Sequence, residues 1–330
     1  MTSTRRRATP GRVPSSVDRG GALRPAAAIP RQPIGGLRRA KRQEALAGLL
    51  FIAPNFFGLL VFLLFPIAAS LALSFTEWDL VSEPEFVGLA NYSRMLEDKQ
   101  FWNSLNNTVL FAAMTIPLTV IVSLSLALAV ERIGKGVLLY RSAFFLPVIA
   151  SVVSVGIVWR WVYNREFGVL NYALDQIGVA PQAWLSSASL VMPSLVLVAV
   201  WKSMGFNMVL FLAGLRAIPR ELLEAAQVDG ASYWQTLRWI TLPLLTPTLL
   251  FVTVMTVIAS FQVFDLVFVM TGGGPGDASR VYYYHLWQNA FRFFRMGYAS
   301  AMAWVLFGIL FGLTLLQMRI IGRRVTYEIA

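Results

Sequence analysis

The sequence contains no cysteine and only one histidine among its 330 residues. The absence of cysteine excludes disulfide bonds, thiol catalysis and cysteine metal sites. Charged residues are scarce as well, at 14% of the chain, compared with about 25% in a soluble globular domain. Hydrophobic residues make up 57%, above the usual level of about 45–50%. This composition indicates a protein whose surface faces lipid over much of its area.

Catalytic and nucleotide-binding patterns are also missing from the sequence. It has no set of side chains with metal-ligand spacing and no nucleophile paired with a base. The phosphate-loop pattern G-x-x-x-x-G-K-[ST] does not occur: Gly134-Lys135 lacks the upstream glycine and the following hydroxyl, and residues 272–276 contain no lysine. We therefore expect a non-catalytic chain that binds no metal, no cofactor and no ATP of its own.

Long uncharged runs dominate what is present. No side chain carries a formal charge from Ala45 to Thr76 or from Gln100 to Val130. A helix needs about 20 apolar residues to cross the hydrocarbon core of a bilayer, and both runs exceed that length. The sequence predicts an all-α integral membrane protein with six transmembrane helices, at about residues 47–74, 108–130, 142–163, 190–215, 245–270 and 297–319.

The net charge of +11 is concentrated at the N-terminus. Residues 1–43 hold eleven basic side chains and one acidic side chain, a net charge of +10, which leaves +1 for the rest. This segment is rich in Pro, Gly, Ser and Arg, so we expect a disordered basic tail that acts as a topology signal and attracts anionic lipid. We expect no nucleic-acid partner. Residues 44–330 are predicted to form the membrane domain, with a core at about 100–320.

The distribution of Lys and Arg predicts the orientation. If both termini are cytoplasmic, the cytoplasmic side holds twenty of the 28 basic residues and the outer side seven, and Lys202 lies within a span. Basic residues collect on the cytoplasmic side of membrane proteins. We therefore predict cytoplasmic N- and C-termini, and we place His285 in an outer loop or interfacial helix.

The segment between the fourth and fifth spans, residues 217–247, is the most informative part of the chain. Residues 221–228 are good helix formers, Asp229-Gly230 is a turn signal, and residues 231–240 carry apolar side chains at helical spacing. Pro243 and Pro247 precede the fifth span. We expect an ordered helix-turn-helix on the cytoplasmic face.

This segment resembles the E-A-A-x-x-x-G signature of binding-protein-dependent ABC importer permeases. It is most similar to the sugar-importer form, E-A-A-x-x-D-G-A followed by I-x-L-P-x-L-x-P. Residues 86–92, 201–208 and 264–275 extend the resemblance to maltose-type and glycerol-phosphate-type permeases. The matching positions of the signature are Glu224, Ala225, Ala226, Asp229, Gly230, Ala231, Ile240, Leu242, Pro243, Leu245 and Pro247.

The resemblance implies a type I ABC importer permease fold in the plasma membrane of a bacterial-type cell. It implies a second homologous permease subunit, two ATPase subunits that bind ATP and magnesium, and an extracytoplasmic solute-binding protein. The substrate it implies is a sugar, with a disaccharide or oligosaccharide expected and glycerol phosphate as the alternative. The coupling helix that contacts the ATPase would be formed by Glu221, Glu224, Ala225, Ala226, Asp229, Gly230 and Ala231.

Polar side chains at membrane depth are candidates for the transport path. Sugars are held by hydrogen bonding and ring stacking, so the candidates for the substrate path are Trp201, Asn207, Phe261, Gln262 and Asp265. The competing interpretation is that these groups fix helix packing, and we favour it for Lys202 and Asp265. A Gly308-x-x-x-Gly312 pair in the last span would permit close helix contact.

Two other functional classes fit the sequence less well. An ion-driven secondary transporter usually shows internal repeats and buried carboxylates within its spans; this sequence has no clear repeat and one intramembrane carboxylate, Asp265. A membrane enzyme needs convergent acid, base or metal groups, and the sequence shows none.

Overall fold

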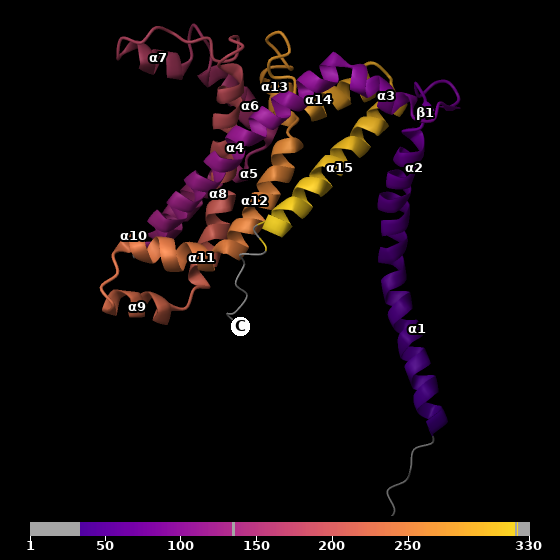
Figure 1. Cartoon of the computed structure of the whole chain (residues 1–330), viewed down its shortest axis with the longest axis horizontal. Helices are drawn as coiled ribbons and strands as arrows, with labels where there is room; N and C mark the ends of the chain where they lie inside the picture. The colour runs from indigo at the N-terminus through magenta and orange to yellow at the C-terminus, as the bar shows by residue number, and fades with distance from the viewer. Residues whose placement is uncertain (1–33, 134–135, 321, 323–330) are drawn as a thin grey trace, which may run out of the picture. The chain divides into compact units, whose positions relative to one another are not determined.

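The computed structural model describes residues 34–133, 136–320 and 322. These residues form helices, connecting loops and one two-stranded antiparallel sheet, in which Thr76 pairs with Phe86 and Glu77 pairs with Glu85 (Figure 1). The chain divides into two compact units, residues 1–63 and 64–330.

The described part of the first unit is helical. It contains α1 (Ile34–Leu59) and most of a short π-helix, η1 (Leu60–Leu64). Phe51 is 87% exposed and Phe57 is 64% exposed, so apolar side chains are open to the surroundings, as suits a helix in lipid. The helix begins ten residues before the predicted domain start at 44, because residues 37–43 are strong helix formers. Residues 1–33 of the predicted tail lie outside the described residues.

The second unit holds the remaining spans and the connecting segments between them. Its elements are α2 (Phe65–Leu73), β1 (Thr76–Glu77), β2 (Glu85–Phe86), α3 (Ala90–Glu97), α4 (Lys99–Glu131), α5 (Val137–Ile149), α6 (Val152–Val162), α7 (Val169–Asp175), α8 (Val191–Arg216), α9 (Arg220–Val228), α10 (Tyr233–Thr236), η2 (Leu237–Thr241), α11 (Leu242–Leu244), α12 (Thr246–Phe261), α13 (Asp265–Met270), α14 (Tyr282–Trp287), η3 (Gln288–Arg292) and α15 (Met296–Ile320).

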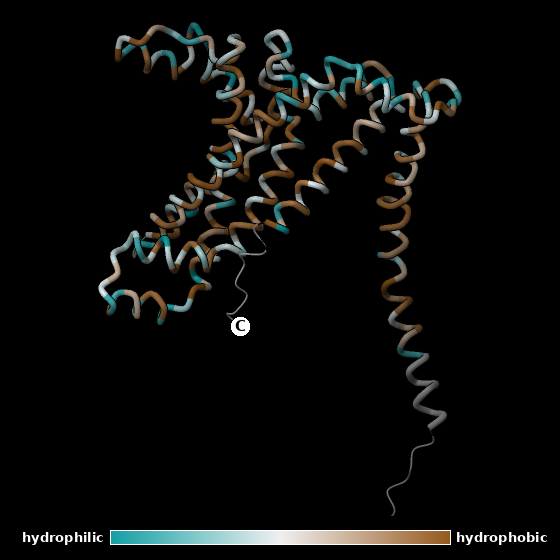
Figure 2. Tube along the Cα trace, viewed as in Figure 1, coloured by the Kyte–Doolittle hydropathy of each residue, from teal (hydrophilic) through white to brown (hydrophobic). Residues whose placement is uncertain are grey.

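Among the described residues, four helices are long and apolar enough to cross a membrane: Gln43–Leu73, α4, α8 and α15. Two bent pairs raise the number to six if each pair is one span. The hydrophobic colouring follows these helices, whereas the connecting segments are largely hydrophilic (Figure 2). The prediction of an all-α protein with six spans is confirmed at this level.

The third and fifth predicted spans differ from continuous helices. The third is divided into α5 and α6, which meet at 97°. The fifth ends at Phe261, and the residues predicted to complete it form a separate short helix, α13. Pro147 lies near the end of α5, and proline removes a backbone donor and kinks a helix.

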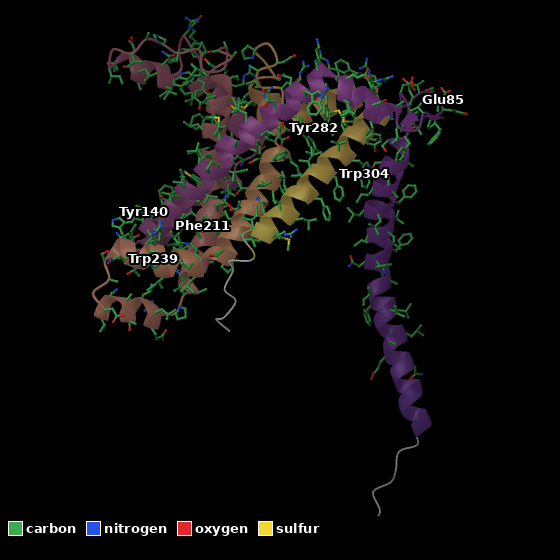
Figure 3. The ribbon with its side chains drawn as sticks, in the orientation of Figure 1. Glu85, Tyr140, Phe211, Trp239, Tyr282 and Trp304 are labelled. Carbon is green, nitrogen blue, oxygen red and sulfur yellow. The ribbon has the colours of Figure 1, made fainter. Side chains whose placement is uncertain are left out.

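Helices α4 and α8 share the most extensive contact in the second unit. Phe111 of α4 and Phe211 of α8 are each 1% exposed or less, and Phe211 lies inside the bundle in Figure 3. Small polar residues of α4, including Thr119 and Ser123, are buried as well. Small residues allow membrane helices to approach closely, so this contact forms the centre of the membrane domain.

Close approach also depends on a glycine that the sequence pattern did not single out. A Cβ added at Gly205 of α8 would overlap the carbonyl oxygen of Phe144 in α5. In contrast, a Cβ at Gly308 or Gly312 meets nothing within 4 Å in the described structure. The G-x-x-x-G pair therefore makes no close helix contact within the described part of this chain.

We predict that Gly205→Ala lowers the free energy of unfolding by about 1–3 kcal/mol, because α5 and α8 must separate to admit the methyl group. Gly308→Ala is the matched control: it replaces a helix glycine without a clash, so the stability should stay the same or rise by up to about 1 kcal/mol. Thermal unfolding in detergent, followed by tryptophan fluorescence, measures both. Equal midpoints for the two variants would contradict the predicted contact.

Candidate functional site

In the segment between α8 and α12, hydrogen-bonded motifs mark the end of one helix, α9, and the start of the next, α10. Helix α9 ends in a Schellman motif, in which the N–H of Gly230 donates to the carbonyl of Gln227 at 3.1 Å and the N–H of Ala231 donates to that of Ala226 at 2.9 Å. Gly230 has φ +75°, a conformation that favours glycine. The turn predicted at Asp229-Gly230 is therefore present, and its geometry explains the glycine.

The second helix of this segment starts two residues later than predicted, at Tyr233 rather than Ala231. The reason is a capping box: Ser232 accepts a hydrogen bond from the backbone N–H of Gln235, and the Gln235 side chain accepts one from the N–H of Ser232 at 2.7 Å. Pro243 and Pro247 each lie in the first turn of a helix, α11 and α12, where no backbone donor is needed. We call residues 220–241 the coupling loop.

The residues of the predicted coupling helix form one exposed surface. Glu221, Glu224 and Asp229 are exposed, together with Ala225 and Gly230. Ala226 is buried and Ala231 half-buried, and the backbone N–H of Ala231 donates to the carbonyl of Ala226. Beside the carboxylates, Val228 and Trp234 are 89% and 73% exposed. An acidic surface with exposed apolar side chains suits a protein partner.

The coupling loop is anchored to the ends of the central helices. Leu223 of α9 packs on a buried cluster that includes Val130 of α4 and Leu215 of α8. In addition, the guanidinium of Arg132 lies 3.7 Å from the centre of the Tyr233 ring. A displacement of α9 or α10 would therefore act directly on α4 and α8.

A cavity of about 240 Å³ lies between α4, α8 and α12. It combines hydroxyl and amide groups with apolar side chains, and no charged residue lines it in the described structure. Asn207 is on its wall and 6% exposed, donating to the carbonyl of Ser203 at 3.1 Å. The polar residues of this wall are Thr115, Ser203, Asn207, Thr256 and Ser260. Only Asn207 was proposed from the sequence, because single hydroxyl residues are common in membrane helices and stand out only when the fold gathers them.

The other predicted path residues lie elsewhere. Trp201 packs edge-on against Trp159, with ring centres 5.5 Å apart. Phe261 is 6% exposed within the cluster that includes Tyr298. Gln262 and Asp265 are exposed at the junction of α12 and α13. These four residues do not line the cavity around Asn207, and their contact with a solute stays a prediction.

Lys202 has a structural partner at the break of the third span. Its Nζ donates to the carbonyl of Ala150 at 2.8 Å and to that of Pro147 at 3.3 Å. The last carbonyls of a helix have no donor within the helix. At the end of α5, the ammonium group of Lys202 provides the missing hydrogen bonds. This contact agrees with the packing role favoured for Lys202.

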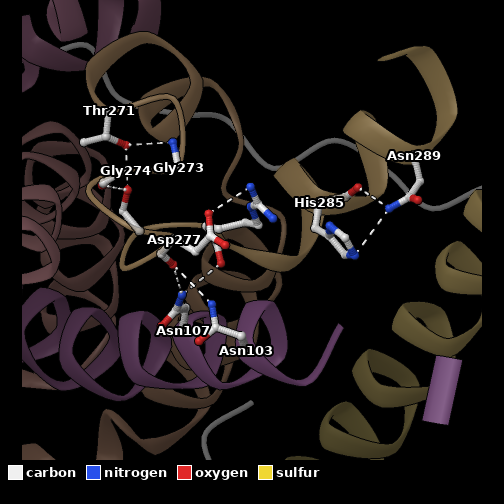
Figure 4. Close-up of polar contacts among 10 residues, drawn as sticks. Asn103, Asn107, Thr271, Gly273, Gly274, Asp277, His285 and Asn289 are labelled. Atoms are coloured by element: carbon white, nitrogen blue, oxygen red, sulfur yellow. Dashed lines mark hydrogen bonds and ion pairs between the residues drawn. The ribbon is translucent and has the colours of Figure 1, made fainter. Parts of the chain in front are cut away.

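At the opposite end of the second unit, residues 271–280 form a folded loop (Figure 4). Asn107 of α4 donates to the carbonyl of Asp277 at 2.8 Å, and Asn103 donates to the same oxygen at 3.2 Å. Within the loop, Ser279 donates to Thr271 and to the carbonyl of Gly274. Nearby, Arg160 donates to the carbonyl of Val269 at 3.3 Å. Two amides of α4 thus hold the glycine-rich loop at one end of the second unit.

The same end carries His285, which is 2% exposed rather than at the surface. Burial holds the pKa of His285 below its usual value of 6.5, despite the nearby Asp98 carboxylate. The Nε2 of His285 is 3.6 Å from the Asp98 carboxylate and 3.3 Å from the Asn289 amide nitrogen. The pKa of Asp98 is itself lowered, because hydrogen bonds from Tyr298 and the Gln100 N–H outweigh partial burial.

Residues 97–327 match the family described as the binding-protein-dependent transport system inner membrane component. The chain belongs to this family. As a permease of the ABC transporter class, it is a multi-pass membrane protein, and the folded, exposed coupling loop lies where the signature of the family was identified.

Curated relatives and solved structures agree with this assignment. The chain is 39% identical to the probable ABC transporter permease protein YesP of Bacillus subtilis over 295 residues, which cover 88% of this chain and 95% of that one. It is 35% identical to the trehalose/maltose transport system permease protein MalF of Thermococcus litoralis, with 86% and 96% covered. Its fold matches a chain of a bacterial ABC transporter that imports the polysaccharide alginate, with a TM-score of 0.75, 22% identity, and 88% and 99% covered. The importer permease fold and the sugar-importer reading drawn from the coupling-loop signature are confirmed.

We predict that stability falls on acidification from about pH 7.5 to about pH 5.5. Because burial lowers the pKa of His285, the unfolded chain takes up a proton at a higher pH than the folded chain does. The contribution of His285 to the free energy of unfolding is therefore complete above pH 6.5 and is lost as the pH falls. Asp98 acts in the same direction below 3.8. Because His285 is the only histidine in the sequence, His285→Gln should remove most of the slope between these pH values, on the order of 1 kcal/mol. Unfolding midpoints measured against pH for both proteins test this, and parallel curves would contradict it.

Proposed function

We propose that this permease forms half of the membrane pathway of an ATP-driven sugar importer, with both termini in the cytoplasm. A homologous permease would complete the pathway, two ATPase subunits would bind ATP and magnesium, and a solute-binding protein would deliver the sugar from outside. The chain itself would be non-catalytic. The observation that carries the proposal is the exposed acidic coupling loop, anchored through Leu223 to the cluster at the ends of α4 and α8.

The mechanism is that of a lever. Closure of two ATPase subunits can reorient membrane helices only through a rigid element that contacts both partners. The Schellman motif and the capping box stiffen the coupling loop, while its exposed carboxylates remain available to basic groups of an ATPase. The excess of Lys and Arg on the same side, twenty against seven, supports a cytoplasmic position for this loop.

The cavity around Asn207 supports a sugar rather than a charged solute. The wall is mostly apolar, with Phe111 and Phe206 available for contact with sugar rings. A few hydroxyls and one amide, whose donors bond to their own helices, can accept hydrogen bonds from a neutral carbohydrate. A phosphate ester would call for Arg or Lys, and none lines this cavity in the described structure. We therefore favour a disaccharide or oligosaccharide over glycerol phosphate. Family membership also counts against an ion-driven secondary transporter.

We predict that Glu224→Lys and Gly230→Pro abolish solute-stimulated ATP hydrolysis in the reconstituted four-subunit importer, with at least about tenfold loss, because the loop no longer fits or holds the ATPase. Gly178→Pro is the matched control: Gly178 has φ +76° and open space, as Gly230 does at φ +75°, but lies far from the coupling loop in sequence. Normal stimulation in both coupling-loop variants would refute the lever.

We further predict that Thr256→Ala lowers sugar uptake by about twofold to tenfold, the value of one hydrogen bond to the solute. Thr253→Ala is the matched control on the same helix. Each threonine hydroxyl donates to its own helix at 2.7 Å, but only Thr256 lines the cavity. Uptake of labelled sugar into proteoliposomes distinguishes them, and equal rates would remove the cavity from the path.

A further inference from the structure

A second cavity, of about 550 Å³, lies between the coupling loop and the ends of α4 and α8. Three arginines line it, Arg132, Arg216 and Arg220, and Glu131 is the one acidic residue among its lining groups in the described structure. The formal charge of the wall is therefore +2. None of these residues belongs to the surface proposed to meet the ATPase.

The arginines retain hydrogen-bonding capacity. The Nε of Arg216 donates to the carboxylate of Glu131 at 3.3 Å. The two terminal nitrogens of this guanidinium therefore remain available as donors. Arg132 presents the face of its guanidinium to Tyr233 at 3.7 Å, so its in-plane N–H groups stay available. Within the described residues no carboxylate forms an ion pair with Arg132 or Arg220. The wall can thus receive an anion with several planar donors, a geometry that suits phosphate.

The rest of the wall is apolar and continues toward the membrane. Leu128 and Leu215 line the cavity. Leu128 lies three residues before the end of α4 at Glu131, and Leu215 lies one residue before the end of α8 at Arg216. Both helices span the membrane. Leu223 and Leu237 of the coupling loop face them across the same space. Charged groups at the helix ends with leucines behind them match an amphiphile that lies with its headgroup at the membrane surface.

We infer that this cavity binds an anionic phospholipid, with the headgroup phosphate held by Arg132 and Arg220 and the start of an acyl chain along Leu128 and Leu215. A cavity of about 550 Å³ has room for a glycerol-phosphate headgroup and the first carbons of a chain. The inference rests on the proposed orientation, which places this end at the cytoplasmic leaflet, where anionic lipid attracts basic groups.

Other occupants fit less well. Residues 323–330 of the chain carry two arginines and one glutamate. Their side chains have a net positive charge, as the cavity wall does, so the two would repel each other. A carboxylate of an ATPase would satisfy the arginines but leave the leucines uncovered. Because the lipid would touch both the coupling loop and the helix ends, it would stiffen the connection between them.

The test uses the full chain in detergent and counts bound lipid by native mass spectrometry during titration with phosphatidylglycerol or phosphatidylcholine. We expect preference for phosphatidylglycerol, with affinity lowered about fivefold by Arg132→Gln and by Arg220→Gln, the usual contribution of one basic residue. Arg238→Gln is the matched control: Arg238 lies in the coupling loop over Trp239 but does not line the cavity, and its loss should leave affinity unchanged.

The inference would be overturned by no preference between the lipids, by equal weakening in Arg238→Gln, or by displacement of the lipid when the ATPase is added. A competition arm with soluble glycerol phosphate separates the two sources of phosphate. Full displacement at millimolar concentration would identify a free anion and refute the lipid. Since binding is measured without sugar or ATP, failure of the importer function would leave these results unaffected.

Discussion

Backbone hydrogen bonding inside lipid is the constraint on which the other features of this permease depend. Hydrocarbon offers no partner to a free carbonyl or N–H group, so every break in a membrane helix needs a donor or acceptor from the protein. The third span breaks between α5 and α6, and Lys202 of α8 supplies donors to the carbonyls of Pro147 and Ala150. A charge at membrane depth is thereby explained by helix geometry, and it also ties α5 to α8 beside the close contact at Gly205.

In the coupling loop, which the proposed function places outside the lipid, two helices must also end and begin in a short space. The Schellman motif at Gly230 and the capping box at Ser232 satisfy their terminal groups without help from a partner. The loop is consequently structured before any ATPase binds. Because Leu223 joins the cluster at the ends of α4 and α8, the proposed function would carry a force on the exposed carboxylates to two of the helices around the Asn207 cavity.

Local sequence signals predicted much of this arrangement. Uncharged runs revealed the spans, because a helix in lipid must be apolar over its whole length. Asp229-Gly230 revealed the turn, because only a residue tolerant of positive φ ends α9 there. The break at residues 262–264 escaped prediction, since a continuous apolar run looks the same whether the helix is straight or bent.

The membrane class, the approximate spans and the coupling-loop signature can be identified from neighbouring residues along the chain. Tertiary packing sets which polar groups meet. It gathered Thr115, Asn207 and Thr256 around one cavity, buried His285, and brought Arg132 and Arg220 to another cavity. These contacts join residues from different helices, and helix packing, which sets such distances, leaves no periodic trace in a single sequence.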